Sequence, residues 1–163
     1  MNPIEAGRFR DAMSTTASGV TVVTTDGEAG RTGVTVSSLC SLSLEPPSVV
    51  LCIHRDSRAL AVLLKNGVFA ANVLTADQER MADIFAGRIA ELKHDRFGEG
   101  EWRTLATGSP VLANSLCSFD CEVAQVFDFG SHHIIAGVVI DLAQETAEPL
   151  VHSNRAYRRL RAA

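Results

Sequence analysis

Short runs of β-branched and other apolar residues recur along the chain and predict a structure rich in strands. The Asp26-Gly27 pair separates two of these runs and is a strong hairpin signal. Pro46-Pro47 precedes another run, and proline is confined to strand ends because it has no backbone N–H to donate. A turn at residues 128–131 separates the two longest runs. The predicted strands cover residues 19–25, 32–36, 48–53, 68–74, 117–127 and 133–142.

Other segments carry apolar residues at helical spacing. Asn66-Gly67 marks the end of one of them, and Thr75 or Asp77 is a candidate N-cap for the next. The predicted helices cover residues 4–13, 58–65, a segment from 75 or 77 to 85, and 154–160. Strands dominate and short turns join many of them, which favours an antiparallel barrel or sandwich over a repeated β-α-β arrangement. A closed barrel would also remove most exposed strand edges.

Composition narrows the class of protein. The 163 residues, 46% of them hydrophobic and 21% charged, predict one compact domain over residues 1–163, long enough to bury a core without disulfides or a metal. A net charge of −4 argues against a nucleic-acid partner, because domains that bind nucleic acid usually carry a basic face. No apolar run approaches a membrane span and the N-terminus lacks signal-peptide features, so a cytoplasmic protein is expected. One basic cluster, expected to be a solvated helix end, contains Arg155, Arg158, Arg159 and Arg161.

The cysteines predict neither disulfides nor a metal site. There is no Cys-x-x-Cys pair and no histidine at zinc-finger spacing. Four thiols that lie in or beside apolar segments are expected to be buried and reduced: Cys40, Cys52, Cys117 and Cys121.

Three segments carry side chains suited to a site, and none matches a common nucleotide-binding or hydrolase motif. Hydroxyls and free amides in residues 35–43 could bind a phosphate or a heteroaromatic ring edge, unless this is an ordinary serine-rich loop. Ser57 and Arg58 open a helix after a strand, which suits an anion or, more simply, a capped helix with a surface arginine. His132 and His133 follow a turn and point to opposite faces, so at most one faces a site, and a surface turn histidine is the alternative.

These segments fall within a longer ordered series of landmarks. In chain order the series is Thr35-Val36-Ser37-Ser38, Ser43-Leu44-x-Pro46-Pro47, Ser57, Gly67-x-Phe69-x-x-Asn72-Val73-Leu74, Gln78, Phe85-Ala86-Gly87, Arg96-Phe97, Trp102, Gly108-x-Pro110-Val111-Leu112 and Gly130-Ser131-His132. The series resembles the short-chain flavin reductase family, whose members supply reduced flavin to two-component monooxygenases. The resemblance runs from about residue 8 to about residue 160. It implies a mainly β fold with flanking helices, an antiparallel Greek-key split β-barrel that binds FMN, working as a homodimer.

The resemblance also assigns roles to residues. The isoalloxazine edge and ribityl chain of the flavin fall to Thr35, Val36, Ser37 and Ser38, with Cys52 and His54 at the border of the same pocket. The phosphate end falls to Ser57, Arg58 and Ala59, and Asn72 is expected to pack under the flavin. A loop near the phosphate or the nicotinamide contributes Lys93, Arg96 and Phe97. Docking of NAD(P)H over the flavin falls to His132, with Gly130 in its turn.

The implied activity is that of an NAD(P)H:flavin oxidoreductase that reduces FMN or FAD and passes it to a flavin-dependent monooxygenase. Two alternatives keep the fold. One changes the role to reduction of cob(II)yrinic acid a,c-diamide or to pyrimidine breakdown, and the other is a flavin- or haem-binding module without turnover. The residues leave FMN against FAD and NADH against NADPH open. Ser131 stands where many family members have aspartate, which leaves the placement of NAD(P)H less well defined.

Overall fold

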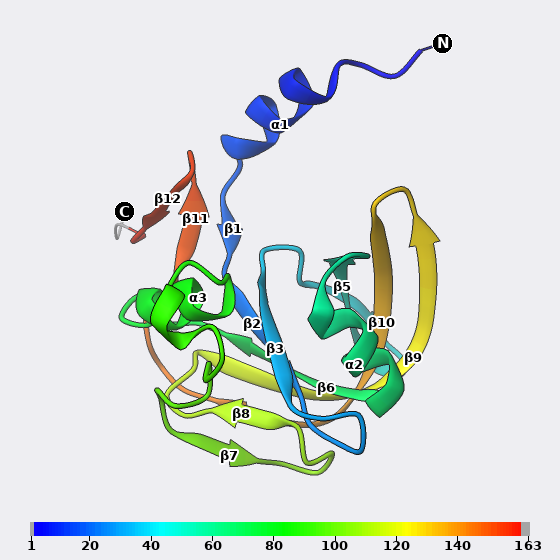
Figure 1. The fold of residues 1–163 in the computed structure, drawn as a ribbon, viewed down its shortest axis with the longest axis vertical. Helices are drawn as coiled ribbons and strands as arrows, with labels where there is room; N and C mark the ends of the chain where they lie inside the picture. The colour runs from blue at the N-terminus through cyan, green and yellow to red at the C-terminus, as the bar shows by residue number, and fades with distance from the viewer. Residues whose placement is uncertain (1, 161–163) are drawn as a thin grey trace.

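The computed structural model describes residues 2–160, and a curved antiparallel sheet of seven strands forms the centre of this part of the chain (Figure 1). Its strand order is β3-β2-β6-β9-β10-β5-β4, so neighbours in the sheet are often distant in sequence. The predicted mainly β fold, a split barrel, is confirmed. The strands are β2 (Thr21–Thr25), β3 (Thr32–Val36), β4 (Cys40–Leu44), β5 (Pro47–His54), β6 (Val68–Val73), β9 (Cys117–Phe129) and β10 (His132–Gln144).

The Ser38 side chain links the two sides of the barrel where the strand ladder is interrupted. β3 contacts β5 without forming a ladder with it, and the Ser38 hydroxyl bridges the gap. Ser38 Oγ accepts a hydrogen bond from Cys52 N at 2.9 Å and donates one to Cys52 O at 3.0 Å. Two strand edges remain open at this split, because β3 and β4 each keep one edge without a strand partner among the described residues. The seam between β3 and β5 is where the cavities described below lie.

Helices cover the ends and one side of the sheet. α2 (Arg58–Asn66) carries the chain from β5 to β6, and it ends at Gly67, whose φ of 70° is a left-handed conformation that suits glycine. α3 (Glu79–Phe85) and the short 3₁₀ helix η1 (Ala90–Leu92) follow β6. α1 (Ala6–Ser14) stands away from the rest of the molecule (Figure 1). None of the described helices is long and apolar enough to cross a membrane.

Two apolar clusters form the core, one on each side of β2, and all five β2 residues are buried. The first cluster packs α2 against the sheet through Leu60 and Leu63, which meet Val23, Leu51 and Phe69. The second packs α3 and the short strand that ends at Leu112 against β2. Its largest members are Leu74, Ile84, Phe85, Leu112 and Leu150.

Two small sheets complete the described residues. One pairs β1 (Ser18–Gly19), β11 (Val151–Ser153) and β12 (Ala156–Arg158), and the other pairs β7 (Trp102–Thr104) with β8 (Pro110–Leu112). The predicted helix at 154–160 is therefore wrong. Asn154 and Arg155 both adopt positive φ and turn the chain, so that His152 pairs with Tyr157. The arginines are not on a helix end: Arg155 pairs with Asp11 and Arg159 with Asp77, while Arg161 lies outside the described residues.

Smaller differences concern element ends and thiols. The predicted helix from residue 75 or 77 begins later, because Thr75 forms a β-bridge with Pro149 and Gln78 becomes the N-cap. Strands β4, β7 and β8 were not expected from the pattern. The prediction of buried thiols is right for Cys121, wrong for the exposed Cys40, and only partly right for two that are half-buried, Cys52 and Cys117.

Candidate functional site

Two neighbouring cavities lie along the seam between β3 and β5, close to the start of α2. The first, of about 300 Å³, is here called the seam cavity, and it is lined mainly by residues 34–38, Cys52, His54 and His132. The second, of about 420 Å³, is called the basic cavity, and it is lined by residues 31–34, the first turn of α2, Phe85 and residues 93–97. Val34 and Ser57 line both, so the two cavities adjoin, and together they are here called the groove.

The wall of the seam cavity is the open edge of β3. Because β3 pairs only with β2 among the described residues, its alternate backbone amides and carbonyls face away from the ladder, and those not held by Arg96 at Gly33 O can bind a planar heterocycle. Two hydroxyls on this wall hold the scaffold: Thr35 Oγ1 donates to Ala82 O at 2.7 Å, and Ser38 bridges to Cys52. Ser37 also lines this cavity.

The mouth of the seam cavity carries two histidines. His54 ends β5 and His132 begins β10, and they are direct cross-strand partners with ring centroids 5.1 Å apart. The tight turn before His132 contains Gly130, whose positive φ of 56° suits the first position of a two-residue hairpin turn. His133 points to the other face, where its Nδ1 lies 2.6 Å from Asp128 Oδ1, as the alternation of a strand requires.

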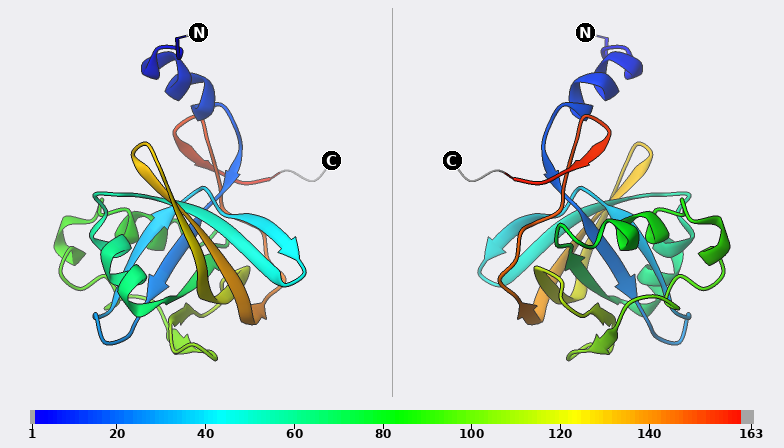
Figure 2. Two further views of the ribbon diagram at one scale, coloured as in Figure 1. Left: turned by 90° about the vertical axis from the view of Figure 1, so that its right-hand side faces the viewer. Right: turned by 90° about the vertical axis from the view of Figure 1, so that its left-hand side faces the viewer.

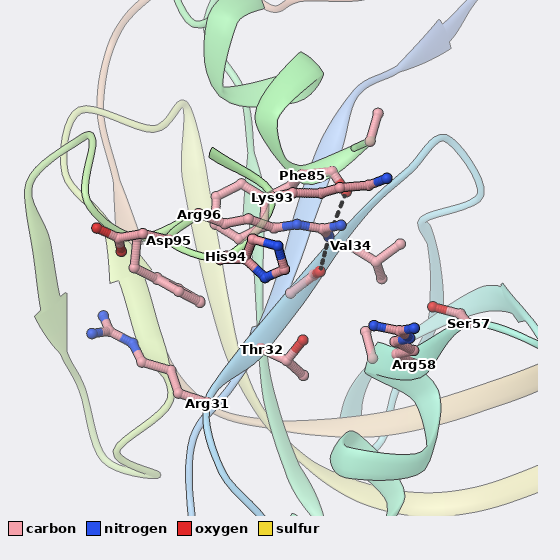
Figure 3. A pocket seen from close by; sticks show the side chains of 14 residues that line it. Arg31, Thr32, Val34, Ser57, Arg58, Phe85, Lys93, His94, Asp95 and Arg96 are labelled. Atoms are coloured by element: carbon pink, nitrogen blue, oxygen red, sulfur yellow. Dashed lines mark hydrogen bonds between the residues drawn. The ribbon is translucent and has the colours of Figure 1, made fainter. Parts of the chain in front are cut away.

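The basic cavity collects positive charge at the start of α2. Ser57 is the N-cap of α2 but its hydroxyl makes no capping hydrogen bond, so the hydroxyl and the amides of Arg58 and Ala59 can face a ligand, while Leu60 N donates to Ser57 O at 3.1 Å. Figure 3 shows Ser57 and Arg58 on one side of the cavity and Lys93 and Arg96 on the other. Including Arg31, four cationic side chains and one carboxylate, Asp95, line the cavity. This is the composition of an anion site.

Backbone carbonyls and aromatic rings fix the far wall of the basic cavity. Arg96 Nη1 donates to Gly33 O at 3.2 Å and to Phe85 O at 3.3 Å, which ties the loop to β3 and α3 (Figure 3). Phe97 packs edge-on against Phe85 at 5.1 Å, and the Arg31 guanidinium lies 4.1 Å above the Phe97 ring. A Cβ at Gly33 would lie 2.7 Å from the Phe85 ring, so this close packing requires glycine.

Comparison with known proteins agrees with this geometry. The model of the flavin reductase-like domain family matches residues 13–161. The chain belongs to this family. It is 42% identical over 156 residues to a protein of Methylorubrum extorquens (strain PA1) named FMN reductase (NADH) RutF 2, covering 95% of this chain and 90% of that one. The predicted family and enzyme class, a flavin reductase, are thereby confirmed.

Solved flavin reductases share the fold. The NADH:FAD oxidoreductase SgcE6 of Streptomyces globisporus C-1027, solved in complex with NAD and FAD fragments, superposes with a TM-score of 0.89 at 29% identity, covering 99% of this chain and 96% of that one. The styrene monooxygenase flavin reductase SMOB of Pseudomonas putida S12 gives 0.84 at 26% identity, covering 96% and 99%. The predicted pairing of a flavin with a nicotinamide is borne out at the level of the family.

The structure of this flavin reductase brings most of the predicted site residues together. Those that line the seam cavity are Thr35, Val36, Ser37, Ser38, Cys52, His54, Ser57 and His132. Those that line the basic cavity are Ser57, Arg58, Ala59, Lys93, Arg96 and Phe97. Two predicted residues line neither: Gly130, which shapes the turn before His132, and Asn72.

Asn72 lies apart from the residues that line the two cavities. Its side chain is fully buried in the core, and both polar atoms are bound within the protein. Nδ2 donates to Val22 O at 3.0 Å, while Oδ1 accepts from Leu112 N at 2.9 Å and from Ser118 Oγ at 2.8 Å. These bonds join β2, β6, β8 and β9 through the Asn72 side chain, which lines neither cavity.

Several lining residues were not foreseen. They are Arg31, Thr32, Gly33, Val34, Ile53, Phe85, Ala86, His94 and Asp95. Most adjoin a predicted residue on the same strand, helix or loop, so extending each predicted segment by a few positions would have found them. Arg31 is different, because only the folding of the β2–β3 hairpin onto Phe97 brings it to the cavity.

Proposed function

We propose that this chain is an NADH-dependent flavin reductase that uses FMN as its flavin. The observation that carries the proposal is the groove, in which an open strand edge with hydroxyls adjoins a cationic cavity at a helix start. A flavin mononucleotide has this order of chemistry along its length, with a planar ring at one end and a phosphate at the other. The name of the M. extorquens relative supports FMN and NADH as the pair.

The residues present fit that ligand. The free amides and carbonyls of β3, with Ser37, would hold the polar edge of the ring, while Ser57, Arg58 and Lys93 would hold the phosphate. When bound, a flavin supplies the hydride-accepting chemistry itself. The protein's part is to orient the ring against the nicotinamide, and the bonds from Ser38 and Arg96 keep both walls of the groove in place for this.

His132 is the residue we propose for docking NADH. It stands at the mouth of the seam cavity on a tight turn, with its ring exposed, so it can contact a nicotinamide that stacks over the ring end of the groove. Its Nδ1 lies 2.9 Å from Ser131 Oγ, which sets the orientation of the imidazole. Ser131 thus occupies the position of the aspartate of other family members and also contacts this histidine.

The proposal extends to assembly and partners. α1 buries none of its residues in its own chain and exposes Phe9 and Met13, and Figure 2 shows it standing apart from the body. Leu44 on the open edge of β4 and Phe129 at the tip of β9 are also exposed. Apolar surface of this extent suits a subunit interface, so we propose a homodimer of one-domain chains. We further propose that it acts in the cytoplasm and supplies reduced flavin to a monooxygenase, which the similarity to SMOB, named as the flavin reductase of styrene monooxygenase, supports.

A single substitution tests the assignment of the two substrates. His132→Ala is expected to raise the KM for NADH or lower kcat by about tenfold or more, because docking of the nicotinamide is lost. The affinity for FMN, measured by fluorescence quenching, is expected to stay within twofold of wild type. A twofold change in affinity is much smaller than a tenfold change, which corresponds to about 1.4 kcal/mol of binding free energy. His152→Ala, on the distant β11, is the matched control. Equal losses of NADH turnover and FMN affinity would contradict the role given to His132.

A further inference from the structure

We propose that His54 and His132 form a two-histidine site for a divalent transition-metal ion, Zn²⁺ or Cu²⁺, at the mouth of the seam cavity. The ligating atoms are the two Nε2 atoms, with water in the remaining positions. Among the described residues no group of three or more histidine, cysteine or acidic side chains is placed to hold a metal, so this is an open, exchangeable site. It differs in kind from a closed structural zinc site, which has four protein ligands.

The backbone pairing places the two rings on one face. Arg55 follows His54, and Ser131 precedes His132. Arg55 N donates to Ser131 O at 3.0 Å, so the hydrogen bond lies one position beyond the His54–His132 pair. In an antiparallel ladder this pattern makes His54 and His132 a non-hydrogen-bonded pair, whose Cα atoms lie about 4.5 Å apart with side chains close together. Both rings therefore project from the same face of the sheet, side by side.

The separation of the rings matches that of a chelate. A Zn–N bond of about 2.0–2.1 Å places the metal about 3.2 Å from the centroid of each ligating imidazole. With a tetrahedral angle at the metal, two such centroids are about 5 Å apart. The observed separation is 5.1 Å. The ring planes lie at 81° to one another, so binding requires the two side chains to turn their Nε2 atoms toward one ion.

The second nitrogen of His132 has a hydroxyl partner, whereas that of His54 accepts a backbone hydrogen bond and has a carboxylate nearby. A metal-bound histidine usually donates its other N–H to a hydroxyl, carbonyl or carboxylate. His132 Nδ1 lies 2.9 Å from Ser131 Oγ. His54 Nδ1 accepts from Asp56 N at 3.2 Å and lies 3.8 Å from Asp56 Oδ2. With a metal on Nε2, the His54 proton would move to Nδ1, and the hydrogen bond from Asp56 N would be replaced by one to the exposed Asp56 carboxylate.

Metal bound here would cover the place at which NADH docks. This consequence rests on the proposed function, whereas the metal site rests only on the geometry above. Zn²⁺ is therefore expected to raise the KM for NADH. The affinity for FMN is expected to change little, because the phosphate end of the groove lies at Ser57 and Arg58, in the adjoining cavity.

Calorimetric titration of the untagged protein with zinc chloride tests the site. Wild type and His152→Gln are expected to bind one Zn²⁺ per chain with equal affinity. His54→Gln and His132→Gln are each expected to bind at least about tenfold more weakly, and Asp56→Asn about tenfold more weakly, as loss of an outer partner does. Wild-type affinity in either histidine variant, or no binding by wild type, would overturn the site.

Two further measurements test which histidines bind the metal and distinguish the metal site from the proposed function. The Cu²⁺ electron paramagnetic resonance spectrum of wild type is expected to show coupling to two imidazole nitrogens, reduced to one in either histidine variant. Two nitrogens persisting in His54→Gln would overturn the assignment. A protein that binds Zn²⁺ as described but never oxidises NADH would retain the metal site and lose the proposed function. A protein that oxidises NADH but binds no Zn²⁺ would do the reverse.

Discussion

Asn72 shows how a polar residue can hold this fold together from inside. It is completely buried, yet its amide satisfies donors and acceptors from strands that are distant in sequence. Such a residue is costly to replace, because a buried donor or acceptor without a partner loses the hydrogen bonds that water would give it. Its spacing in the sequence resembles that of a ligand residue, but its surroundings make it a structural one.

Asn72→Ala tests this distinction. The substitution leaves Leu112 N and Ser118 Oγ without their acceptor, so the free energy of unfolding is expected to fall by about 2–4 kcal/mol. FMN affinity, measured well below the lowered melting temperature, is expected to be unchanged because Asn72 lines neither cavity. Chemical denaturation and flavin titration of the same preparation give both quantities. An unchanged melting temperature with a large loss of FMN affinity would restore the flavin contact.

Labelling of the cysteine thiols can report whether FMN occupies the groove. Burial raises the pKa of the Cys121 thiol to about 12, and burial also raises the pKa of Cys117, so neither forms much thiolate at pH 8. Cys40 is exposed on β4, and Cys52 lines the seam cavity. Iodoacetamide is expected to label Cys40 quickly with or without FMN, and Cys52 only when FMN is absent. Mass spectrometry of the labelled peptides measures this, and equal labelling of Cys52 under both conditions would place the flavin elsewhere.

At the scale of elements, the start of α2 is the feature most closely tied to function. Its N-cap hydroxyl makes no capping bond and its first turn faces Lys93 and Arg96, so the helix presents free donors where a phosphate would lie. Ser57→Ala and Arg58→Gln are each expected to weaken FMN binding about tenfold, as loss of a charge-assisted hydrogen bond does. Riboflavin, which lacks the phosphate, is expected to bind these variants as it binds wild type. Lys65→Gln, in the last turn of the same helix, is the control.

A comparable loss for riboflavin would show that these residues support the whole groove and do not select the phosphate. Calorimetric or fluorescence titration of the two flavins against each variant distinguishes the two results.

The elements also show what the sequence could and could not predict. Long β-branched runs predicted the main strands, because alternation and turn residues are local signals. The segment from Asn154 to Leu160 has helix-forming residues, yet its strand arises because His152 pairs with Tyr157 and Val151 with Gly19. The lining residues at 57–59 were found from the chain order of landmarks, while Arg31 reached the cavity only through hairpin folding. Local pattern thus predicts elements, and long-range pairing decides the rest.

At the scale of the whole molecule, the exposed apolar residues of α1 predict a dimer. Because α1 buries nothing in its own chain, Phe9→Glu with Met13→Glu is expected to disrupt association while leaving the melting of the monomer fold nearly unchanged. Light scattering after size-exclusion chromatography is expected to give twice the chain mass for wild type and the chain mass for the double variant. A wild-type monomer at micromolar concentration, or a double variant that remains dimeric, would contradict this interface.

The central claim is that the groove along β3 and α2 reduces a flavin at the expense of NADH. The most direct test is anaerobic oxidation of NADH by the purified protein, followed by absorbance, with and without added FMN, FAD or riboflavin. We predict rapid oxidation of NADH with a matching loss of oxidised flavin absorbance, with FMN the preferred acceptor. A protein that binds FMN but leaves NADH unoxidised with every flavin would contradict the account, and the groove would then be a flavin-binding site without reductase activity.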